Sequence, residues 1–351
     1  MAIAFDWKGQ LKGIVASNEQ LKKYFDADKA KADEINRVTD VYKMGISPYL
    51  AKLLHHESIR KQFVPDIDEL TQHDLLSNDP LSEGENTPVA RLVHKYPDRA
   101  AIFASDFCFA YCRHCTRKNT VLTGLGMITE KEILDIIGYL EKSPEINDVL
   151  ITGGDPLTLD DSVLENLINR IRLIPHISTI RIGTRAVVSA PMRITEELVG
   201  MLRKYHPVWV HVQFNHPAEI TSEARQACER LLSAGIPLNN QSVLLKGIND
   251  NTETMRELLL ALISIRIRPY YLYRCDYVRG TGHFLTEVCT GMDIISALQG
   301  TIPGYALPRF VLDTCGIGGK IAVEHSGILY EDDEKLILRG TGGRPQEYKL
   351  L

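Results

Sequence analysis

From residue 98 onwards, short apolar runs alternate with amphipathic helical segments, and this alternation constrains the fold more than any other feature of the sequence. Strands that alternate with helices form parallel sheets, because each helix carries the chain back across the sheet. The pattern predicts an α/β fold. We interpret it as a partial (β/α)6 TIM-like barrel, although a doubly wound open sheet would give a similar pattern.

The individual elements can be placed from hydrophobic spacing. The expected strands are 100–105, 148–152, 179–184, 209–214, 238–245 and 268–273, and the expected helices are 130–143, 162–174, 196–205, 222–235, 254–265 and 291–300. Polar residues and glycines cluster directly after the strands. Barrel active sites lie at that carboxyl-terminal face of the strands.

The regions on either side of this alternation have a different character. Residues 1–90 are mostly polar with apolar residues at helical intervals, and 79–88 has the composition of a linker. Residues 308–313, 320–325, 327–331 and 335–340 are typical of short strands. We therefore expect three parts: a helical N-terminal extension (1–90), a barrel (91–300) and a strand-rich C-terminal segment (301–351).

Composition narrows the class of protein. The chain has 351 residues, 44% hydrophobic and 24% charged, with a net charge of −5, which gives no sign of a nucleic-acid partner. No apolar run reaches the roughly 18 residues that a membrane helix needs, and the N-terminus lacks a signal-peptide pattern. We expect a cytoplasmic protein without a membrane partner. The seven cysteines are an odd number, which argues against a disulfide framework.

Three of these cysteines, Cys108, Cys112 and Cys115, fall within eight residues in the loop after the first barrel strand. Thiolates spaced C-x3-C-x2-C can hold three corners of a [4Fe–4S] cubane and leave the fourth iron without a protein ligand. That open iron can chelate a cofactor through amino and carboxylate groups, as S-adenosylmethionine would require. The alternative is a structural zinc ion completed by a remote Cys or His.

A glycine pair, Gly153 and Gly154, followed by Asp155 and a proline, ends the strand 148–152. Glycines at such a position let backbone approach a ligand closely, and the acid can receive an ammonium group. Taken alone, the motif is more often a simple turn. Its position one strand–helix unit after the cysteine loop strengthens the functional interpretation.

The stretch 316–319 is glycine-rich and leads into Lys320. It resembles a shortened phosphate loop but lacks a following Ser or Thr and a following helix. A lysine in such a loop can form a Schiff base with an aldehyde cofactor. Spacing alone favours a solvated surface lysine over that role.

Two acids, Asp276 and Asp313, each end a strand-like run that faces the expected mouth of the barrel. A pair of carboxylates could bind a cationic side chain, although structural capping acids are equally common. His211 alternates within a strand and is compatible with a core position.

These motifs together resemble the lysine 2,3-aminomutase family of radical S-adenosylmethionine enzymes. The resemblance covers about residues 40–340 and rests on DFCFAYCRHCTRK, LITGGDPL, IRIGTRAVV, FNHP, NNQSVLLKGIND, RPYYLYRCD, GHFLT and FVLDTCGIGGK, all in family order. It implies three cofactors: the [4Fe–4S] cluster, S-adenosylmethionine and pyridoxal 5′-phosphate. It also reverses the preference for Lys320, which matches the family's pyridoxal phosphate lysine.

The resemblance also implies roles for other side chains near the cofactors. Asp155 and its neighbouring glycines match the group that holds the S-adenosylmethionine amino group, and His114 and Gln241 match positions near the same ligand. Tyr96, Arg99 and Lys95 match residues around pyridoxal phosphate, with Lys95 standing where the family has arginine.

For the substrate, Arg117 matches the residue that binds the α-carboxylate, and Tyr273 matches an aromatic at the reaction centre. Asp276 and Asp313 match the acids that receive the distal ammonium of lysine. Gln213 departs from the family pattern, because it replaces a histidine near the adenosyl group. The sequence also lacks the family's long C-terminal extension with clustered cysteines, and Asn251 stands where the family has a cysteine. We therefore expect no structural zinc and a different subunit assembly.

The implied reaction is a 2,3-aminomutation, an isomerisation in which a radical removes hydrogen from C3 and the amino group moves from C2 to C3. L-lysine is the expected substrate because two carboxylates favour a cationic side chain. Arginine 2,3-aminomutation and modification of a lysine attached to a protein are the alternatives. A flavodoxin- or ferredoxin-type electron donor and a homo-oligomer are the expected partners.

Overall fold

The computed structural model describes residues 6–25, 28–119, 124–314, 319–325, 327–332, 335–339 and 345–349. A nine-stranded sheet forms its centre, and the strands lie side by side in the order in which they occur along the chain. The sheet strands are β1 (Leu92–Tyr96), β2 (Arg99–Ser105), β3 (Asp148–Gly153), β4 (Thr179–Thr184), β5 (Val208–Val212), β6 (Leu238–Leu244), β7 (Arg268–Arg274), β8 (Arg309–Thr314) and β9 (Gly319–Ala322).

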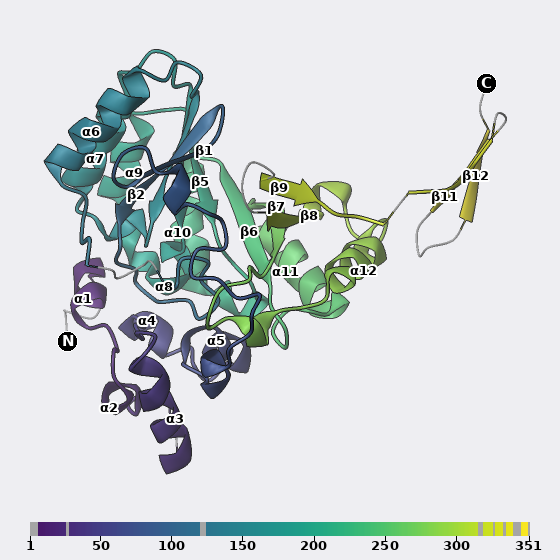
Figure 1. Cartoon of the computed structure of the whole chain (residues 1–351), viewed down its shortest axis with the longest axis horizontal. Coiled ribbons are helices and arrows are strands. Elements are labelled where there is room, and N and C mark those ends of the chain that lie inside the picture. The colour runs from purple at the N-terminus through teal and green to yellow at the C-terminus, as the bar shows by residue number, and fades with distance from the viewer. Residues whose placement is uncertain are drawn as a thin grey trace.

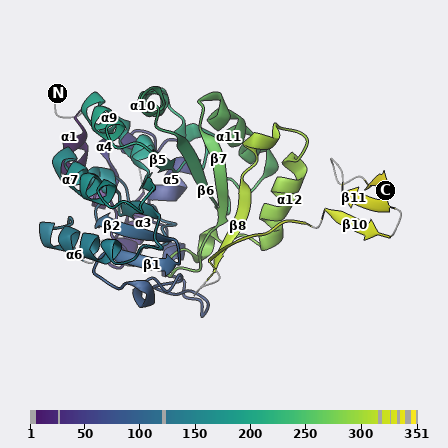
Figure 2. The ribbon, with the colours of Figure 1, turned by 90° about the horizontal axis from the view of Figure 1, so that it is seen from above.

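Neighbouring strands from β2 to β8 are parallel, whereas β1 and β9 are antiparallel to their neighbours at the two edges. Among the described residues no ladder joins β1 to β9, so the barrel is partial. Helices surround the arc of strands in Figure 2. The predicted α/β class and partial barrel are confirmed.

The helices occupy the positions that hydrophobic spacing predicted, together with short ones that it missed. They are α1 (Trp7–Lys12), α2 (Asn18–Leu21), α3 (Lys29–Thr39), α4 (Pro48–Ala51), α5 (Glu57–Phe63), α6 (Glu130–Glu141), α7 (Asp161–Arg172), α8 (Ala186–Ser189), α9 (Glu196–Arg203), α10 (Ser222–Ser233), α11 (Thr252–Ser264) and α12 (Val288–Leu298). Short 3₁₀ turns occupy Ile67–Leu70, Gly84–Asn86, Pro156–Thr158, Pro191–Arg193, Pro217–Glu219, Gly282–Phe284 and Gly304–Ala306. No helix in the described part of the chain is long and apolar enough to cross a membrane.

Helix α6 shows how sequence produces these elements. Thr129 and Glu132 form a capping box that satisfies the free amides at its start. Ile133, Ile136 and Leu140 follow at helical spacing and are buried against the sheet. Each such side chain contributes roughly 1.5–3 kcal/mol of hydrophobic stabilisation.

The strands place apolar and polar side chains on opposite faces, because neighbouring residues of a strand point in opposite directions. In β3, Val149 and Ile151 are fully buried in the core, whereas Leu150 and Thr152 line a cavity inside the barrel. The inner face therefore carries polar groups. The alternation of His211 within its strand was compatible with a core position. In the structure, His211 of β5 instead lines this cavity.

The N-terminal helices pack on the barrel through a shared core. Ile35, Leu50 and Phe63 are fully buried in the same hydrophobic cluster as the barrel strands. Segment 79–88, expected to be a linker, is folded locally: the Asp79 carboxylate accepts hydrogen bonds from the amides of Glu83 and Gly84.

The C-terminal segment divides into two structural parts. Strands β8 and β9 belong to the barrel sheet, whereas β10 (Ile328–Glu331), β11 (Lys335–Arg339) and β12 (Pro345–Lys349) form a separate antiparallel sheet. Figure 1 shows β11 and β12 standing away from the helices that surround the barrel. Strands β1 and β12 were not predicted. The division of the chain at residues 90 and 300 stays a prediction.

Candidate active site

One cavity of about 1250 Å³ runs along the inside of the barrel, from residues that follow the carboxyl ends of the strands to the first residues of β2, β3 and β4. Every residue that the sequence proposed for a site lines this cavity. They are Lys95, Tyr96, Arg99, Cys108, Cys112, His114, Cys115, Arg117, Gly153, Gly154, Asp155, Gln241, Tyr273, Asp276, Asp313 and Lys320. Cys315 and residues 316–318 of the glycine-rich stretch lie outside the described residues.

The three cysteines of the loop after β2 lie close enough to affect one another's charge. Burial, the charge of Asp155 and the two other thiols raise the pKa of Cys108 well above its usual range. Burial and the neighbouring Cys112 raise the pKa of Cys115 to about 11. Among the described residues, no three Cys, His, Asp or Glu side chains are arranged around a single ion. Three grouped thiols fit a cluster in which each thiolate binds a different iron.

Gly153 and Gly154 pack directly against the base of the cysteine loop. A Cβ on Gly154 would lie 2.3 Å from the backbone oxygen of Phe107, and one on Gly153 would lie 2.4 Å from that of Ser105. Gly153 also has a φ of +126°, which side-chain-bearing residues rarely adopt. The glycine pair is therefore required for the close approach of β3 to the segment that leads into Cys108.

The Asp155 carboxylate is fully buried and already engaged in hydrogen bonds within the protein. It accepts hydrogen bonds from the Thr184 hydroxyl at 2.8 and 2.9 Å and from the amides of Leu157 and Arg185 at 3.0 and 2.9 Å. Burial outweighs these bonds and raises its pKa. Asp155 thus joins the ends of β3 and β4 beside the cysteine loop.

His114 and Gln241 lie on the wall between the cysteine loop and the barrel interior. The Nε2 atom of His114 lies 3.2 Å from the side-chain nitrogens of Asn215 and Gln213. Burial lowers the pKa of His114 well below its usual range, so the ring is neutral. Gln241 lies 3.4 Å from Nδ1 of His211, and burial lowers the pKa of His211 to about 4. Both imidazoles therefore act as neutral hydrogen-bonding groups.

On the opposite wall, the β8–β9 hairpin brings Lys320 directly across from Asp313. The Lys320 Nζ atom lies 2.8 Å from Oδ2 of Asp313, and the Lys95 Nζ atom lies 3.9 Å from Oδ1. Lys95 also donates to the backbone oxygen of Thr314 at 2.7 Å. The Asp313 side chain is 8% exposed and the Lys320 side chain 32% exposed, and both line the cavity.

Tyr96 connects this hairpin to Arg99. The Arg99 guanidinium lies 4.1 Å from the centre of the Tyr96 ring, and the Lys320 ammonium lies 5.6 Å from it. A Cβ on Gly319 would lie 2.6 Å from the same ring. The buried Tyr96 hydroxyl has no hydrogen-bond partner among the residues that the structure describes. Arg99 and Lys95 are basic, and the Tyr96 hydroxyl is unpartnered beside the primary amine of Lys320. This set of groups fits an aldehyde cofactor that carries a phosphate.

Asp276 follows β7 and faces the same space as Asp313. Its carboxylate accepts a hydrogen bond from the Thr116 hydroxyl of the cysteine loop. Burial raises the pKa of Asp276 to about 6, and the negative charge of Asp313 acts in the same direction, whereas Thr116, Lys320 and Arg117 oppose it. The negative charge of Asp313 therefore acts on Asp276, and a cation between the two carboxylates would relieve their repulsion.

Arg117 and Tyr273 complete the wall near the acids. Arg117 makes a two-point ion pair with Glu83, at 2.9 and 2.7 Å, and its guanidinium lies 4.4 Å from the centre of the Phe103 ring. Burial raises the pKa of Tyr273 well above its usual range, and Asp313 adds to this effect, so its phenol stays protonated. Glu83 was not predicted, because it lies in the segment expected to be a linker.

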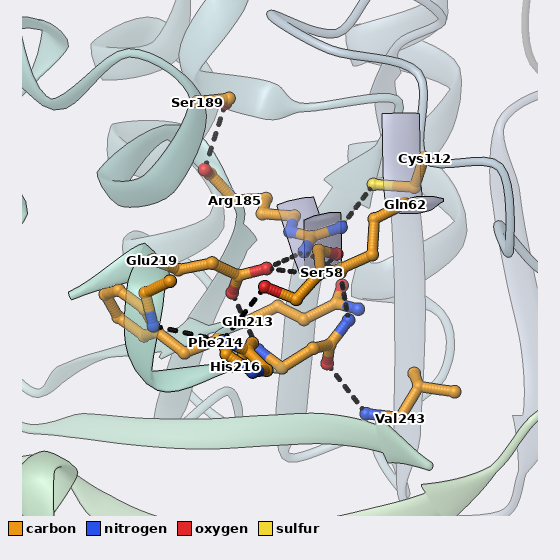
Figure 3. Close-up of polar contacts among 12 residues, drawn as sticks. Ser58, Gln62, Cys112, Arg185, Ser189, Gln213, Phe214, His216, Glu219 and Val243 are labelled. Atoms are coloured by element: carbon orange, nitrogen blue, oxygen red, sulfur yellow. Dashed lines mark hydrogen bonds and ion pairs between the residues drawn. The ribbon is translucent and has the colours of Figure 1, made fainter. Parts of the chain in front are cut away.

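Arg185, at the end of β4, is the most prominent cavity residue to which the sequence gave no role. Its Nη1 donates to Sγ of Cys112 at 2.8 Å, and its Nη2 donates to Gln62 at 2.6 Å and Glu219 at 2.9 Å. Figure 3 shows Gln62 and Glu219 meeting the Arg185 guanidinium, which points at Cys112. The position of Arg185 directly after a strand was a signal, but its partners lie far away in the sequence.

Family models match the two regions that build this cavity. Residues 102–259 match the model described as the radical SAM superfamily, which defines the class of protein. Residues 295–349, which include the β8–β9 hairpin, match the model described as lysine-2,3-aminomutase. The chain therefore combines a barrel of the radical SAM class with the C-terminal segment of one particular family.

Similar proteins lead to the same family. The L-lysine 2,3-aminomutases of Fusobacterium nucleatum and Bacillus subtilis are 44% and 43% identical, each over 96% of this chain and over 80% and 73% of those proteins. The glutamate 2,3-aminomutase of Clostridioides difficile is 37% identical over 97% of this chain and 82% of that protein. This chain belongs to the lysine 2,3-aminomutase family and is an aminomutase, an isomerase.

A solved structure of Streptococcus suis SuiB bound to S-adenosylmethionine covers 82% of this chain and 61% of that one, at 13% identity and a TM-score of 0.47.

Proposed function

We propose that this aminomutase converts L-lysine into β-lysine, using a [4Fe–4S] cluster, S-adenosylmethionine and pyridoxal 5′-phosphate. The observation that carries the proposal is the placement of Asp276 and Asp313 on one cavity with Lys320 and the three cysteines. Two acids at one end of that cavity fit an amino acid whose side chain ends in a cation.

In this proposal the two halves of the cavity hold different cofactors. Cys108, Cys112 and Cys115 hold the cluster, and the glycine pair, His114 and Gln241 face S-adenosylmethionine. The Asp155 carboxylate already accepts hydrogen bonds from Thr184 and Arg185. In this proposal it therefore fixes the strand ends around that ligand. When bound, the reduced cluster and S-adenosylmethionine supply a radical that can remove hydrogen from an unactivated carbon.

On the other side, Lys320 would hold the pyridoxal phosphate aldehyde before substrate binds, and the amino group of the substrate would replace the Lys320 amine on that aldehyde before it migrates. Arg99 and Lys95 face the phosphate, and Tyr96 offers its hydroxyl. The amine of Lys320 must lose its proton to react with an aldehyde, so it then no longer balances the charge of Asp313. The carboxylate is thereby released for a substrate ammonium.

Substrate choice follows from the charge balance at the acids. The substrate would enter while Lys320 is attached to the aldehyde, and Asp313 and Asp276 would then together favour a compact cationic group and repel a second carboxylate. Glutamate is therefore disfavoured, although a relative that is 37% identical carries the name glutamate 2,3-aminomutase. Arg117 binds the α-carboxylate of the substrate. The same guanidinium is oriented by its two hydrogen bonds to Glu83.

Anaerobic incubation with dithionite, both organic cofactors and separate samples of L-lysine, L-arginine and L-glutamate tests the proposal. We expect β-lysine from lysine and little or no product from the other two. Preferred turnover of arginine or glutamate would overturn the substrate assignment and keep the aminomutase class. An electron donor of the flavodoxin or ferredoxin type is proposed to replace dithionite in the cell.

A further inference from the structure

Arg185 lines the cavity beside the cysteine loop and touches one of the cysteines. Its Nη1 lies 2.8 Å from Sγ of Cys112, and the residue is 8% exposed. Figure 3 shows the guanidinium pointing at the sulfur from the β4–α8 loop. A cationic donor at this distance forms a charge-assisted hydrogen bond to a thiolate, which is stronger than one between neutral groups.

The guanidinium is held in place from several directions. Nη2 donates to Glu219 at 2.9 Å and to Gln62 at 2.6 Å, and the Phe63 ring lies 4.6 Å from the guanidinium carbon. The Glu219 carboxylate is fully buried and accepts further hydrogen bonds from the Gln62 amide and the Asn215 backbone. A side chain fixed in this way points at Cys112 without reorganising.

Gln62 links the cation to the cysteine loop itself. Its backbone oxygen accepts a hydrogen bond from the Arg113 amide at 2.8 Å, while its side-chain oxygen accepts from Arg185. Helix α5 therefore sets both the position of the loop and that of the cation beside it. Gln62 and Glu219 are positioning residues for Arg185.

We propose that Arg185 raises the reduction potential of the cluster by donating a hydrogen bond to the Cys112 sulfur. Reduction moves one electron from the external donor to the cluster and leaves its sulfurs more negative. A fixed cation at a ligand sulfur stabilises that reduced form more than the oxidised form. The inference rests on the cluster of the proposed function, and it concerns how easily that cluster accepts the electron.

Three variants test this inference. Arg185→Met removes the charge and both donors, and Arg185→Lys keeps the charge but loses the planar fork. Arg193→Met is the matched control, because Arg193 is also buried, stacked on an aromatic ring (Trp7, 4.3 Å) and paired with one carboxylate (Asp161). Its guanidinium also donates to the backbone oxygens of Leu157 and Leu159.

Each variant is reconstituted without oxygen, its iron and sulfide are counted, and its potential is titrated by electron paramagnetic resonance. For Arg185→Met we expect the equilibrium constant for reduction to fall about tenfold, a shift of about −59 mV for a one-electron couple. Arg185→Lys should shift in the same direction by less, and Arg193→Met should keep the wild-type potential.

A wild-type potential in Arg185→Met, with its cluster loaded, would overturn the inference. So would an equal negative shift in Arg193→Met, because the effect would then belong to general destabilisation. If Arg185→Met retains no iron, the potential of Arg185→Lys is used instead. A wild-type potential in Arg185→Lys would then count against the inference. Failure of the wild-type chain to take up iron would instead refute the proposed cluster.

Discussion

The two walls of the cavity are built in opposite ways. On the wall formed by the cysteine loop and the ends of β3 and β4, internal hydrogen bonds and backbone contacts hold the polar groups. Asp155 accepts hydrogen bonds there from one hydroxyl and two backbone amides, and Gly154 is packed against Phe107. On the wall formed by β8 and β9, Lys320 and Asp313 balance each other's charge across the hairpin.

This difference matches the demands that the proposed function places on the two walls. Radical generation requires a fixed geometry, and a rigid loop provides it without reorganisation. Binding a charged substrate requires a partner that can be exchanged. An ion pair such as that between Asp313 and Lys320 can be replaced by another at little net cost, because one cation takes the place of another. A substitution that deforms the rigid wall should therefore have a larger effect than one on the exchangeable wall.

The largest effect is expected from Gly154→Ala on the rigid wall. Its Cβ would meet the Phe107 backbone oxygen at 2.3 Å, so the cysteine loop must move and turnover should be lost together with most of the iron. Gly138→Ala in α6 is the control, because no contacting atom of the described residues would lie within 4 Å of the added Cβ. It should retain iron and gain roughly 0.5–1 kcal/mol of stability. Iron analysis measures the iron content of both variants, and thermal melting measures their stability. Full iron content in Gly154→Ala would show that the close approach is not required.

The next largest effect is expected from Lys320→Ala on the exchangeable wall. Loss of the amine should lower turnover by at least about 100-fold and abolish the covalent pyridoxal phosphate signal in the absorbance spectrum. The iron content should stay at the wild-type value, because the cysteine loop is held by other contacts. Simultaneous loss of iron would show that the two walls do not behave independently.

Asp276→Asn should weaken recognition of lysine and leave the chemistry intact. The amide can still accept the Thr116 hydrogen bond but cannot balance an ammonium group. Removing one partner of a buried charge pair costs about 2–5 kcal/mol, so kcat/KM for lysine should fall about 30-fold or more. Norleucine, which lacks the ammonium, provides the control substrate, and its kcat/KM should stay the same. Equal losses for both substrates would contradict a charge-recognition role.

A smaller effect is expected from pH. Asp276 has a pKa raised to about 6 by burial and by Asp313, so it is neutral below that pH and ionised above it. Because an ammonium binds the ionised form, kcat/KM for lysine should fall about tenfold per pH unit below about 6 and level off above it. In Asp276→Asn this limb of the profile should disappear. Its persistence there would assign the titration to another group.

The sequence could predict part of the cavity because Cys108, Gly154 and Asp276 follow the ends of parallel strands, which meet at one edge of the sheet. It could not predict the partners that hold them. Gln62 and Glu219 are separated by 157 positions, and Glu83 lies in an apparent linker. The pairing of Lys320 with Asp313 depends on the β8–β9 register, which no motif encodes. Partner choice is a property of packing and needs the structure.

L-lysine deuterated at C3 gives the most direct test of the central claim, that one cavity joins a radical-generating wall to a lysine-binding wall. The labelled substrate is turned over without oxygen, and the 5′-deoxyadenosine and β-lysine are analysed by mass spectrometry. We predict deuterium in 5′-deoxyadenosine, because hydrogen from C3 passes to the radical formed at the cysteine loop. Formation of β-lysine with unlabelled 5′-deoxyadenosine would contradict the claim.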